Sequence, residues 1–296
     1  MVDRDNLMVV ARDVERVELD PSDILLTDQV AVVTGGGGGI GQGIALGLAR
    51  FGCDVAVIDV VPERCTATEA AIGRLGRRGL GIPGDVMDAE FLTGAIARVG
   101  EHFGRLDILV NNAGGSRSGS FLSQPAGSVR RHVDINLFSL FFATQAAAPL
   151  MIEGGRGGSI VNVTSIEGLR AAPGFAVYAA CKAGVVSFTK SMALELAEHR
   201  IRVNALAPDH TITPGTRGNR VGPVDPESWA DSDFDTLASV VPLGREGIVE
   251  ECASTAIWLC SRMSDYVTGV TVNVDGGTWA SSGWLREPDG RWTQHT

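Results

Sequence analysis

Residues 30–43 read VAVVTGGGGGIGQG, a mostly β-branched run followed by five consecutive glycines and the start of a helical pattern. The run 30–34 favours a strand that is buried on both faces. A glycine-rich turn between a strand and a helix lets backbone N–H groups approach a phosphate, because no Cβ atom stands in the way. The order strand, glycine turn, helix therefore predicts the first part of a βαβ unit that binds a dinucleotide.

The same alternation of short β-branched runs and longer helical patterns continues along the chain. Strands are predicted at 30–34, 55–59, 81–83, 106–110, 159–164, 201–207 and 270–274. Helices are predicted near 40–51, 62–77, 88–103, 128–152, 175–198 and 247–261. This alternation predicts an α/β fold in which a doubly wound, seven-stranded parallel sheet carries helices on both faces.

One domain is expected over residues 28–280. Residues 1–27 are interpreted as an N-terminal extension and residues 281–296 as a C-terminal tail. Residues 209–240 are rich in Pro, Gly, Asp and Thr, which predicts a long loop. Because long loops in compact domains are often functional, this loop is expected to close over a substrate.

Composition disfavours several classes of protein. The 296 residues carry a net charge of −10, which opposes binding to nucleic acid and to anionic membrane surfaces. The sequence shows no apolar run of about 18 residues and no N-terminal signal pattern, so no membrane association and a cytoplasmic location are expected. The five cysteines form no CxxC motif, which favours buried free thiols and predicts no metal site.

The second predicted strand ends at Asp59, eighteen residues after Gly41. A carboxylate at this position accepts hydrogen bonds from the adenosine ribose and repels a 2′-phosphate. Neither Gly38 nor Val60, which flank the expected pocket, is basic. The pattern favours NAD over NADP, and a solvated aspartate at a strand end is the alternative interpretation.

Tyr178 and Lys182 are four residues apart on a strong helical pattern, so they share one helix face. A nearby ammonium favours the phenolate and brings the pKa of a tyrosine, normally ~10, closer to neutral. Ser165 ends a predicted strand, where a hydroxyl can orient an alcohol or a carbonyl, although a turn serine is the plainer interpretation. Asn136 interrupts a helical pattern, which suggests either a buried hydrogen-bonding role or a capping role.

From about residue 20 to residue 280 the chain resembles the short-chain dehydrogenase/reductase family. The motifs that carry the resemblance are TGGGGGIG at 34–41, Asp59, GDV at 84–86, NNAG at 111–114, Asn136, Ser165, YAACK at 178–182, NALAP at 204–208 and DGG at 275–277. The resemblance implies a single-domain Rossmann-type fold. It also implies hydride transfer between a nicotinamide cofactor and a secondary alcohol or ketone.

The resemblance also implies a role for each matching residue. Tyr178 would be the general acid/base, and Lys182 would hold the nicotinamide ribose and lower the pKa of Tyr178. Ser165 would position the substrate oxygen, and Asn136 would support a proton relay through water to Lys182. The implied cofactor-binding residues are Gly35, Gly38, Gly39, Ile40, Gly41, Asp59, Val60, Asp85, Val86, Asn112, Ala113, Gly114, Tyr178, Lys182, Pro208, Thr211 and Thr213.

The chain departs from the family pattern after Pro208, where Asp209 and His210 replace the usual glycine and its neighbour. His210 is either a second titrating group or a turn residue. Glu167 and Arg170 follow Ser165 at the expected rim of the substrate site, where they either bind a polar substrate or remain exposed charges.

The leading hypothesis is an NAD-dependent dehydrogenase or reductase that acts on a small secondary alcohol or ketone. The alternatives are a 3-oxoacyl-thioester reductase, a sugar or hydroxysteroid dehydrogenase and, in another class, a catalytically silent NAD-binding sensor. Family members are commonly tetramers packed through the helix near 128–152 and the Tyr–Lys helix, so a homotetramer is expected. Phe138, Phe141 and Phe142 cannot all face one core stripe, so they are either buried all round or meet another subunit.

Overall fold

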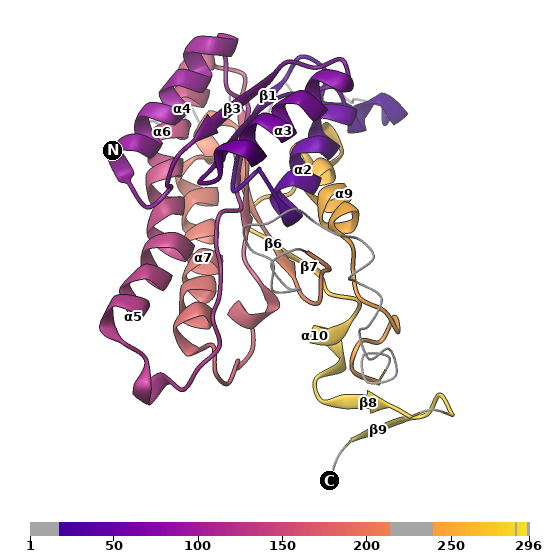
Figure 1. The fold of residues 1–296 in the computed structure, drawn as a ribbon. Coiled ribbons are helices and arrows are strands. Elements are labelled where there is room, and N and C mark those ends of the chain that lie inside the picture. The colour runs from indigo at the N-terminus through magenta and orange to yellow at the C-terminus, as the bar shows by residue number, and fades with distance from the viewer. Residues whose placement is uncertain (1–17, 214–238, 288, 295–296) are drawn as a thin grey trace, which may run out of the picture.

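A seven-stranded parallel sheet forms the middle layer of the molecule (Figure 1). The computed structural model describes residues 18–213, 239–287 and 289–294. The sheet order is β3-β2-β1-β4-β5-β6-β7, so the chain winds outward from β1 in one direction and then from β4 in the other. The strands are β1 (Val30–Thr34), β2 (Asp54–Asp59), β3 (Gly79–Pro83), β4 (Ile108–Asn111), β5 (Gly158–Val163), β6 (Ile201–Pro208) and β7 (Thr271–Val274). The predicted doubly wound fold is confirmed.

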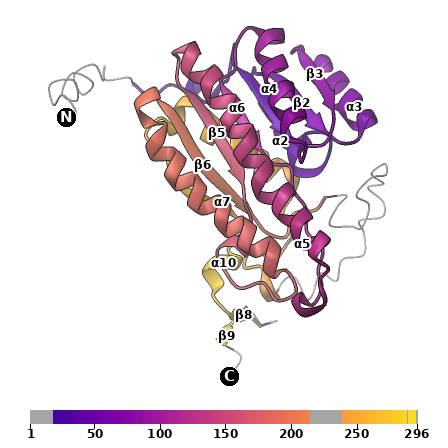
Figure 2. The same cartoon turned by 90° about the vertical axis from the view of Figure 1, so that its left-hand side faces the viewer.

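Helices cover both faces of this sheet. Figure 2 looks onto the face covered by α4 (Ala89–Phe103), α6 (Ser139–Gly154) and α7 (Ala176–Glu195). The other face packs against α2 (Gly39–Arg50) and α9 (Val249–Cys260). Val30 and Val32 of β1 pack in the first layer, whereas Ala31 and Val33 pack in the second. Because successive strand residues point to opposite faces, a strand between two helical layers is apolar throughout.

A π-helical turn, Asp134–Phe138, separates α5 (Ala126–Val133) from α6. The predicted continuous helix at 128–152 is therefore interrupted. A π turn holds one extra residue, which changes the direction of the side chains that follow it. Asn136 lies inside this turn and is buried, so the residue that disturbs the helical pattern marks the irregular turn.

Ala126–Gly154, which spans α5, the π turn and α6, is the one helix in the described ranges that is long and apolar enough to cross a membrane. This statement concerns length and composition only, and 44% of its apolar window is buried inside the domain. Its residues Ala143, Ala147, Ala148 and Met151 belong to the core layer that also contains α4. Burial in the core of the α/β domain therefore explains why this helix is so apolar.

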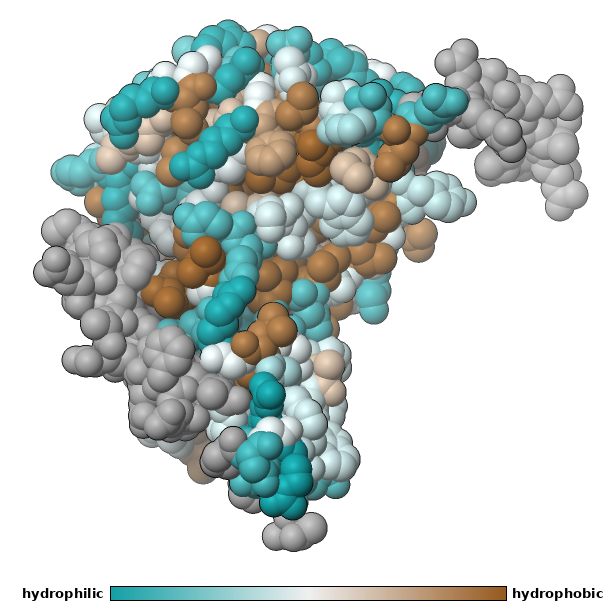
Figure 3. Space-filling view, turned by 90° about the vertical axis from the view of Figure 1, so that its right-hand side faces the viewer, coloured by the Kyte–Doolittle hydropathy of each residue, from teal (hydrophilic) through white to brown (hydrophobic). Residues whose placement is uncertain are grey.

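The segments before β1 and after β7 extend the sheet domain at its two ends. Leu26 is fully buried against the layer that contains α2 and α9. After β7 come the short helix α10 (Thr278–Ser281) and an antiparallel hairpin of β8 (Trp284–Arg286) and β9 (Trp292–Gln294). This hairpin projects from the body of the domain, as Figures 1 and 3 show. The predicted loop at 209–240 lies largely outside the described residues. All five cysteines are buried and free, as predicted.

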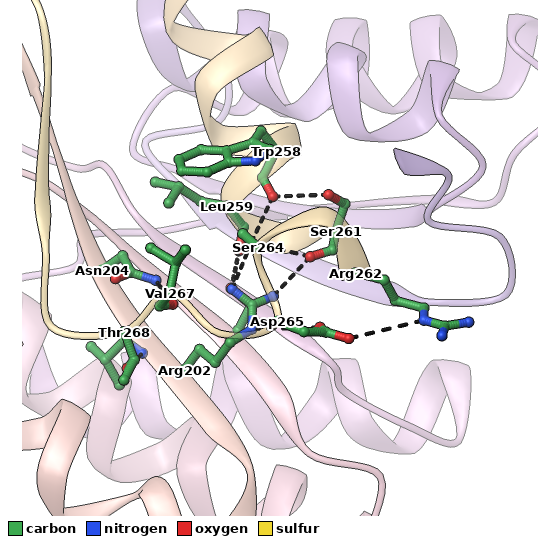
Figure 4. A network of polar contacts seen from close by, with 12 residues as sticks. Arg202, Asn204, Trp258, Leu259, Ser261, Arg262, Ser264, Asp265, Val267 and Thr268 are labelled. Carbon is green, nitrogen blue, oxygen red and sulfur yellow. Dashed lines mark hydrogen bonds and ion pairs between the residues drawn. The ribbon is translucent and has the colours of Figure 1, made fainter. Parts of the chain in front are cut away.

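The Arg202 side chain connects β6 with the end of α9 (Figure 4). On the other side of the sheet order, helix α3 (Pro62–Arg74) follows β2. The Arg202 guanidinium donates hydrogen bonds to the Leu259 carbonyl at 2.6 Å and to the Ser261 carbonyl at 3.1 Å. Carbonyls in the last turn of a helix have no helical N–H partner, so the arginine satisfies them. Asn204, two residues along β6, donates to the Val267 carbonyl at 2.8 Å. These bonds fix the strands whose ends carry Pro208 and Asp275.

Candidate active site

The glycine-rich turn forms a cradle at the N-terminus of α2. Gly35 has a φ of +63°, and a Cβ atom added there would lie 2.9 Å from Asn112 Nδ2. A Cβ on Gly41 would overlap the Gly35 carbonyl oxygen. The helix begins at Gly39, and its N-cap Gly38 offers no side-chain hydrogen bond. Free N–H groups at a helix start and a turn without side chains fit a pyrophosphate, so a dinucleotide fits here.

The ends of β1 and β4 are locked together beside this cradle. Thr34 Oγ1 accepts hydrogen bonds from the N–H groups of Asn112 at 3.0 Å and Ala113 at 3.1 Å. Asn112 Nδ2 donates to the Thr34 carbonyl at 3.0 Å and the Gly35 carbonyl at 3.2 Å. The segment that contains Ala113 and Gly114 therefore lies next to the glycine turn.

Asp59 ends β2 at the edge of the cradle, and only 8% of it is exposed. Its Oδ2 accepts a hydrogen bond from the Gly37 N–H and its Oδ1 one from the Val61 N–H, both at 3.0 Å. The carboxylate is therefore held in place beside the turn, while the neighbouring Val60 side chain is exposed. Asp85 and the buried Val86 follow β3, the strand next to β2.

Arg64 is a basic residue in this corner that the sequence reasoning missed. Its Nη1 lies 3.3 Å from the position of a Cβ on Gly38. The sequence pattern points only to positions 38 and 60 as places for a cation, and neither residue is basic. The start of α3 is the signal that predicts it. Because the helix begins at Pro62, Arg64 falls in its first turn, which follows closely after Asp59 at the end of β2.

Tyr178 and Lys182 lie one turn apart on α7, as predicted. Lys182 Nζ is 5.6 Å from the centroid of the Tyr178 ring and donates to the Val163 carbonyl at 2.8 Å. Burial lowers the pKa of Lys182 from 10.5 to about 8. Burial also raises the pKa of Tyr178 to about 12, which is opposite to the direction expected from a neighbouring cation. Without a cofactor, desolvation of the phenolate outweighs any stabilisation by Lys182.

Ser165 joins this pair from the segment that follows β5. Its hydrogen bond to Tyr178 lowers the pKa of the phenol, and the charge of Glu167 raises it. The Ser165 hydroxyl also donates to the Pro208 carbonyl at 3.4 Å and accepts from the Glu167 N–H at 3.2 Å. One hydroxyl thus connects the Tyr178 helix with the end of β6.

Asn136 sits behind the pair and bonds only to backbone in the contacts the structure gives it. Its Oδ1 accepts from the Gly115 N–H at 3.0 Å, and its Nδ2 donates to the carbonyls of Gly115 and His132, both at 2.9 Å. A Cβ on Gly114 would lie 2.8 Å from Asn136 Oδ1 and 3.5 Å from Lys182 Nζ. Asn136 and Lys182 therefore face each other across Gly114.

The segment after β6 contacts both Gly247, which precedes α9, and the glycine-rich turn. Thr211 is buried and pairs with Gly247 in an isolated parallel bridge. The Thr213 side chain lies 3.4 Å from the position of a Cβ on Gly39, so it sits over the glycine turn. The predicted residues that end or follow β1, β2, β3, β4 and β6 therefore lie along the carboxyl edge of one parallel sheet, where open α/β sheets bind their ligands.

A charged cluster lies beside Ser165. Arg170 Nη2 is 2.9 Å from Glu167 Oε1 and 3.8 Å from Asp209 Oδ2. His210 Nε2 lies 3.7 Å from the same Asp209 oxygen. Burial raises the pKa of Asp209, whereas His210 and Arg170 oppose that shift. Glu167 and Arg170 are thus paired with each other. Within residues 18–213, 239–287 and 289–294 no group of three His, Cys, Asp or Glu side chains could hold a metal ion.

Comparisons with known proteins agree with this arrangement. A family model described as enoyl-(acyl carrier protein) reductase matches residues 35–278. The 2-dehydro-3-deoxy-D-gluconate 5-dehydrogenase of Escherichia coli strain K12 is 38% identical over 252 residues, which are 85% of this chain and 96% of that protein. The L-rhamnose 1-dehydrogenase (NAD(P)(+)) of Sphingomonas sp. strain SKA58 is 36% identical over 262 residues, 87% of this chain and 98% of that protein.

A solved structure extends the comparison to three dimensions. The 7α-hydroxysteroid dehydrogenase complexed with NADH and 7-oxo glycochenodeoxycholic acid matches with a TM-score of 0.80 at 30% identity. The match covers 88% of this chain and 98% of that one. The chain belongs to the short-chain dehydrogenase/reductase family and is an NAD(P)-dependent oxidoreductase that interconverts alcohols and ketones.

Proposed function

We propose that this enzyme transfers hydride between NAD and a small secondary alcohol or ketone, with Tyr178 as the general acid/base. One observation carries the proposal: Ser165 hydrogen-bonds to Tyr178, and Lys182 Nζ lies 5.6 Å from the centroid of the Tyr178 ring. When bound, NAD supplies the acceptor for the hydride that leaves the carbinol carbon. The protein's own residues manage the substrate oxygen and its proton.

The Ser165 hydroxyl orients the substrate oxygen toward Tyr178. During oxidation the phenolate oxygen of Tyr178 takes the hydroxyl proton, and during reduction the phenol returns it to the carbonyl oxygen. Because the pKa of Tyr178 is raised to about 12 in the cofactor-free protein, the neutral phenol dominates at pH 7 and is ready to donate. The Lys182 ammonium stabilises the phenolate that oxidation needs and holds the nicotinamide ribose. Asn136 positions the Gly114–Gly115 segment next to Lys182.

NAD is the preferred cofactor in this proposal. The buried Asp59 carboxylate is fixed by two backbone N–H groups and opposes a 2′-phosphate. Arg64 beside Gly38 acts in the other direction, so some use of NADP is expected. Cofactor contacts are assigned to the predicted residues along the carboxyl edge of the sheet, including Val60, Asp85 and Val86 at the adenine end.

A 3-oxoacyl-thioester reductase is the second candidate function. Arg64 is the specific observation in its favour, because a cation in the ribose corner suits NADPH. NADPH-dependent reduction of acetoacetyl-CoA, more efficient than any NAD-linked alcohol oxidation, would select this candidate.

The assembly is proposed to be a cytoplasmic homotetramer with a small-molecule substrate and no nucleic-acid partner. Support for the tetramer comes from an aromatic cluster on α6, α7 and the π turn. Phe138 is 39% exposed, and its ring centroid is 6.2 Å from that of Phe141, which lies 4.7 Å from that of Phe188.

The deciding experiment replaces each of the chain's two tyrosines with phenylalanine. Tyr178→Phe should lower kcat with NAD and a panel of secondary alcohols by about 10³-fold and leave the Kd of NADH within twofold. Tyr266 is fully exposed, so Tyr266→Phe is the matched control and should change neither value. Turnover by Tyr178→Phe close to that of the wild type would refute the assignment.

A further inference from the structure

A cavity of about 500 Å³ lies between the segment after Ser165 and the C-terminal end of the chain. Among the described residues that line it are Arg170, Thr278, Trp279, Ser281, Ser282 and Trp284. Trp279 is 41% exposed and Trp284 43% exposed, so both indole rings are available to a ligand. Arg170 bonds to Glu167, whose N–H bonds to Ser165, so two hydrogen bonds connect the wall of the cavity with Ser165.

The Arg170 guanidinium is held in a fixed and nearly neutral setting. Glu167 Oε1 lies 2.9 Å away and Asp209 Oδ2 lies 3.8 Å away, and the Asp209 side chain is only 8% exposed. A ligand carboxylate near Arg170 would therefore meet two carboxylates as well as the cation. The N–H groups of Arg170 that do not face Glu167 remain hydrogen-bond donors for a neutral ligand.

The hydroxyl groups along α10 offer the complementary acceptors. Ser281 Oγ donates to the Thr278 carbonyl at 2.8 Å, and Ser282 Oγ donates to the Trp279 carbonyl at 3.4 Å. Thr278 Oγ1 donates to the Asp275 carbonyl at 2.8 Å. Thr278 is buried and also hydrogen-bonds to Asp209, so it belongs to the support of the wall. Because the hydroxyl hydrogens of Ser281 and Ser282 are used in these bonds, their oxygens remain acceptors for a ligand.

A wall that holds both donors and acceptors matches a group that can donate and accept, which is a hydroxyl. A carboxylate or a thioester carbonyl only accepts, so it would leave the serine oxygens unmatched. The two indole rings supply apolar faces on which the C–H face of a ring can pack. Arginine, carboxylate, hydroxyl and tryptophan side chains together suit a neutral polyol or sugar.

We propose that this cavity binds a second hydroxyl group of the substrate, so that the enzyme acts on neutral polyols or sugars rather than on simple alcohols, sugar acids or acyl thioesters. Arg170, Trp279 and Ser282 are the specificity-determining residues. The inference rests on the proposed function, because the reacting hydroxyl is placed at Ser165 and Tyr178.

The test compares substrates that share one ring. Cyclohexanol, cis-1,2-cyclohexanediol, myo-inositol and cis-2-hydroxycyclohexanecarboxylate are assayed with NAD. The diol or the inositol should exceed cyclohexanol in kcat/KM by at least about tenfold, as expected where a site bonds a substrate hydroxyl. The hydroxy acid should be no better than cyclohexanol.

Three variants locate the effect. Arg170→Gln, Trp279→Leu and Ser282→Ala should each reduce this preference at least fivefold. Trp279→Leu and Ser282→Ala should also leave cyclohexanol oxidation within twofold, whereas Arg170→Gln removes the partner of Glu167, whose charge raises the pKa of Tyr178. Ser191→Ala removes an exposed hydroxyl on α7 that bonds to the Ser187 carbonyl, so it is the matched control for Ser282→Ala. Should Arg170→Gln fold poorly, the two uncharged variants still test the site.

A binding measurement separates the two hypotheses. Titration with the preferred polyol should change tryptophan fluorescence in a saturable way, and Trp279→Leu should weaken this binding at least fivefold. Saturable binding without oxidation of any alcohol would refute the proposed function and support the cavity site. Equal oxidation of cyclohexanol and the polyols, unchanged by the variants, would overturn the cavity site and leave the proposed function standing.

Discussion

Lys182 is a buried cation whose burial costs stability. Its pKa falls from 10.5 to about 8, and only 4% of the residue is exposed. Between pH 8 and 10.5 the unfolded chain binds this proton and the folded protein does not, so the contribution of Lys182 makes stability rise with pH. Below pH 8 the folded protein carries the full penalty, which is about 3 kcal/mol for a shift of this size.

Lys182→Met should therefore abolish turnover and yet raise the free energy of unfolding at pH 7, by about 1–3 kcal/mol. The gain should shrink as the pH rises from 8 toward 10.5. Urea denaturation at several pH values measures it, and Lys190→Met, at an exposed position on the same helix, is the control. A variant that is less stable than the wild type at pH 7 would contradict the assignment of a penalty to Lys182.

Asp59 and Arg64 act in opposite directions on a 2′-phosphate. Asp59→Ala should lower the ratio of the Kd of NADP to the Kd of NAD at least tenfold, because it removes the repelling carboxylate. Arg64→Gln should raise the same ratio several-fold and change NAD binding little. Fluorescence titration with NADH and NADPH measures both ratios. If Arg64→Gln leaves NADPH binding unchanged, the guanidinium does not contact the 2′-phosphate.

Among the elements, β6 and the end of α9 are joined by the Arg202 side chain as well as by core packing. Arg202 is 13% exposed and bonds to the carbonyls of Leu259 and Ser261 and to Ser264 Oγ. Arg202→Met would remove these charge-assisted hydrogen bonds, although the two carbonyls keep donors in Ser159 and Ser264. The expected cost is about 1.5–3 kcal/mol in the free energy of unfolding. Arg262→Met is the matched control, since Arg262 is 57% exposed and makes only longer ion pairs. Equal losses in the two variants would refute this account.

The elements that could be predicted from sequence are those whose pattern reflects burial between two layers. The strand and helix positions agree with the structure to within a few residues, because alternate residues of strands such as β1 face opposite cores. The glycine-rich cradle was also predictable, because its glycines are required by close packing of the backbone. Gly35 and Gly41 stand where a Cβ would collide with backbone or with Asn112.

Other features depend on spatial neighbours that a linear pattern does not show. The π turn at Asp134–Phe138 has ordinary helical composition apart from Asn136, whose partner Gly115 is distant in sequence. The contact of Arg64 with Gly38 depends on where α3 begins. The C-terminal hairpin did leave a signal, since residues 287–290 read EPDG, a combination typical of turns. The raised pKa of Tyr178 reflects desolvation, which residue spacing does not predict.

For the whole molecule, the proposed homotetramer needs a surface through which copies of the chain associate. The side chains of Phe138, Phe141 and Phe188 form an aromatic cluster on α6, α7 and the π turn. The same helix α7 also carries Tyr178 and Lys182. An interface built on this cluster would therefore support the helix that holds the catalytic pair.

Phe138→Glu should dissociate the assembly, because a charge at the centre of a symmetric interface is repeated by every copy. The wild type should sediment at about four times the chain mass of 31.0 kDa, and the variant at one or two times that mass. Leu75→Glu is the matched control, because Leu75 is 38% exposed against 39% for Phe138 and lies at the end of α3. The thermal midpoint of the wild type should rise with protein concentration, whereas that of a monomeric variant should not. A Phe138→Glu variant that keeps the wild-type mass would show that the copies associate through another face.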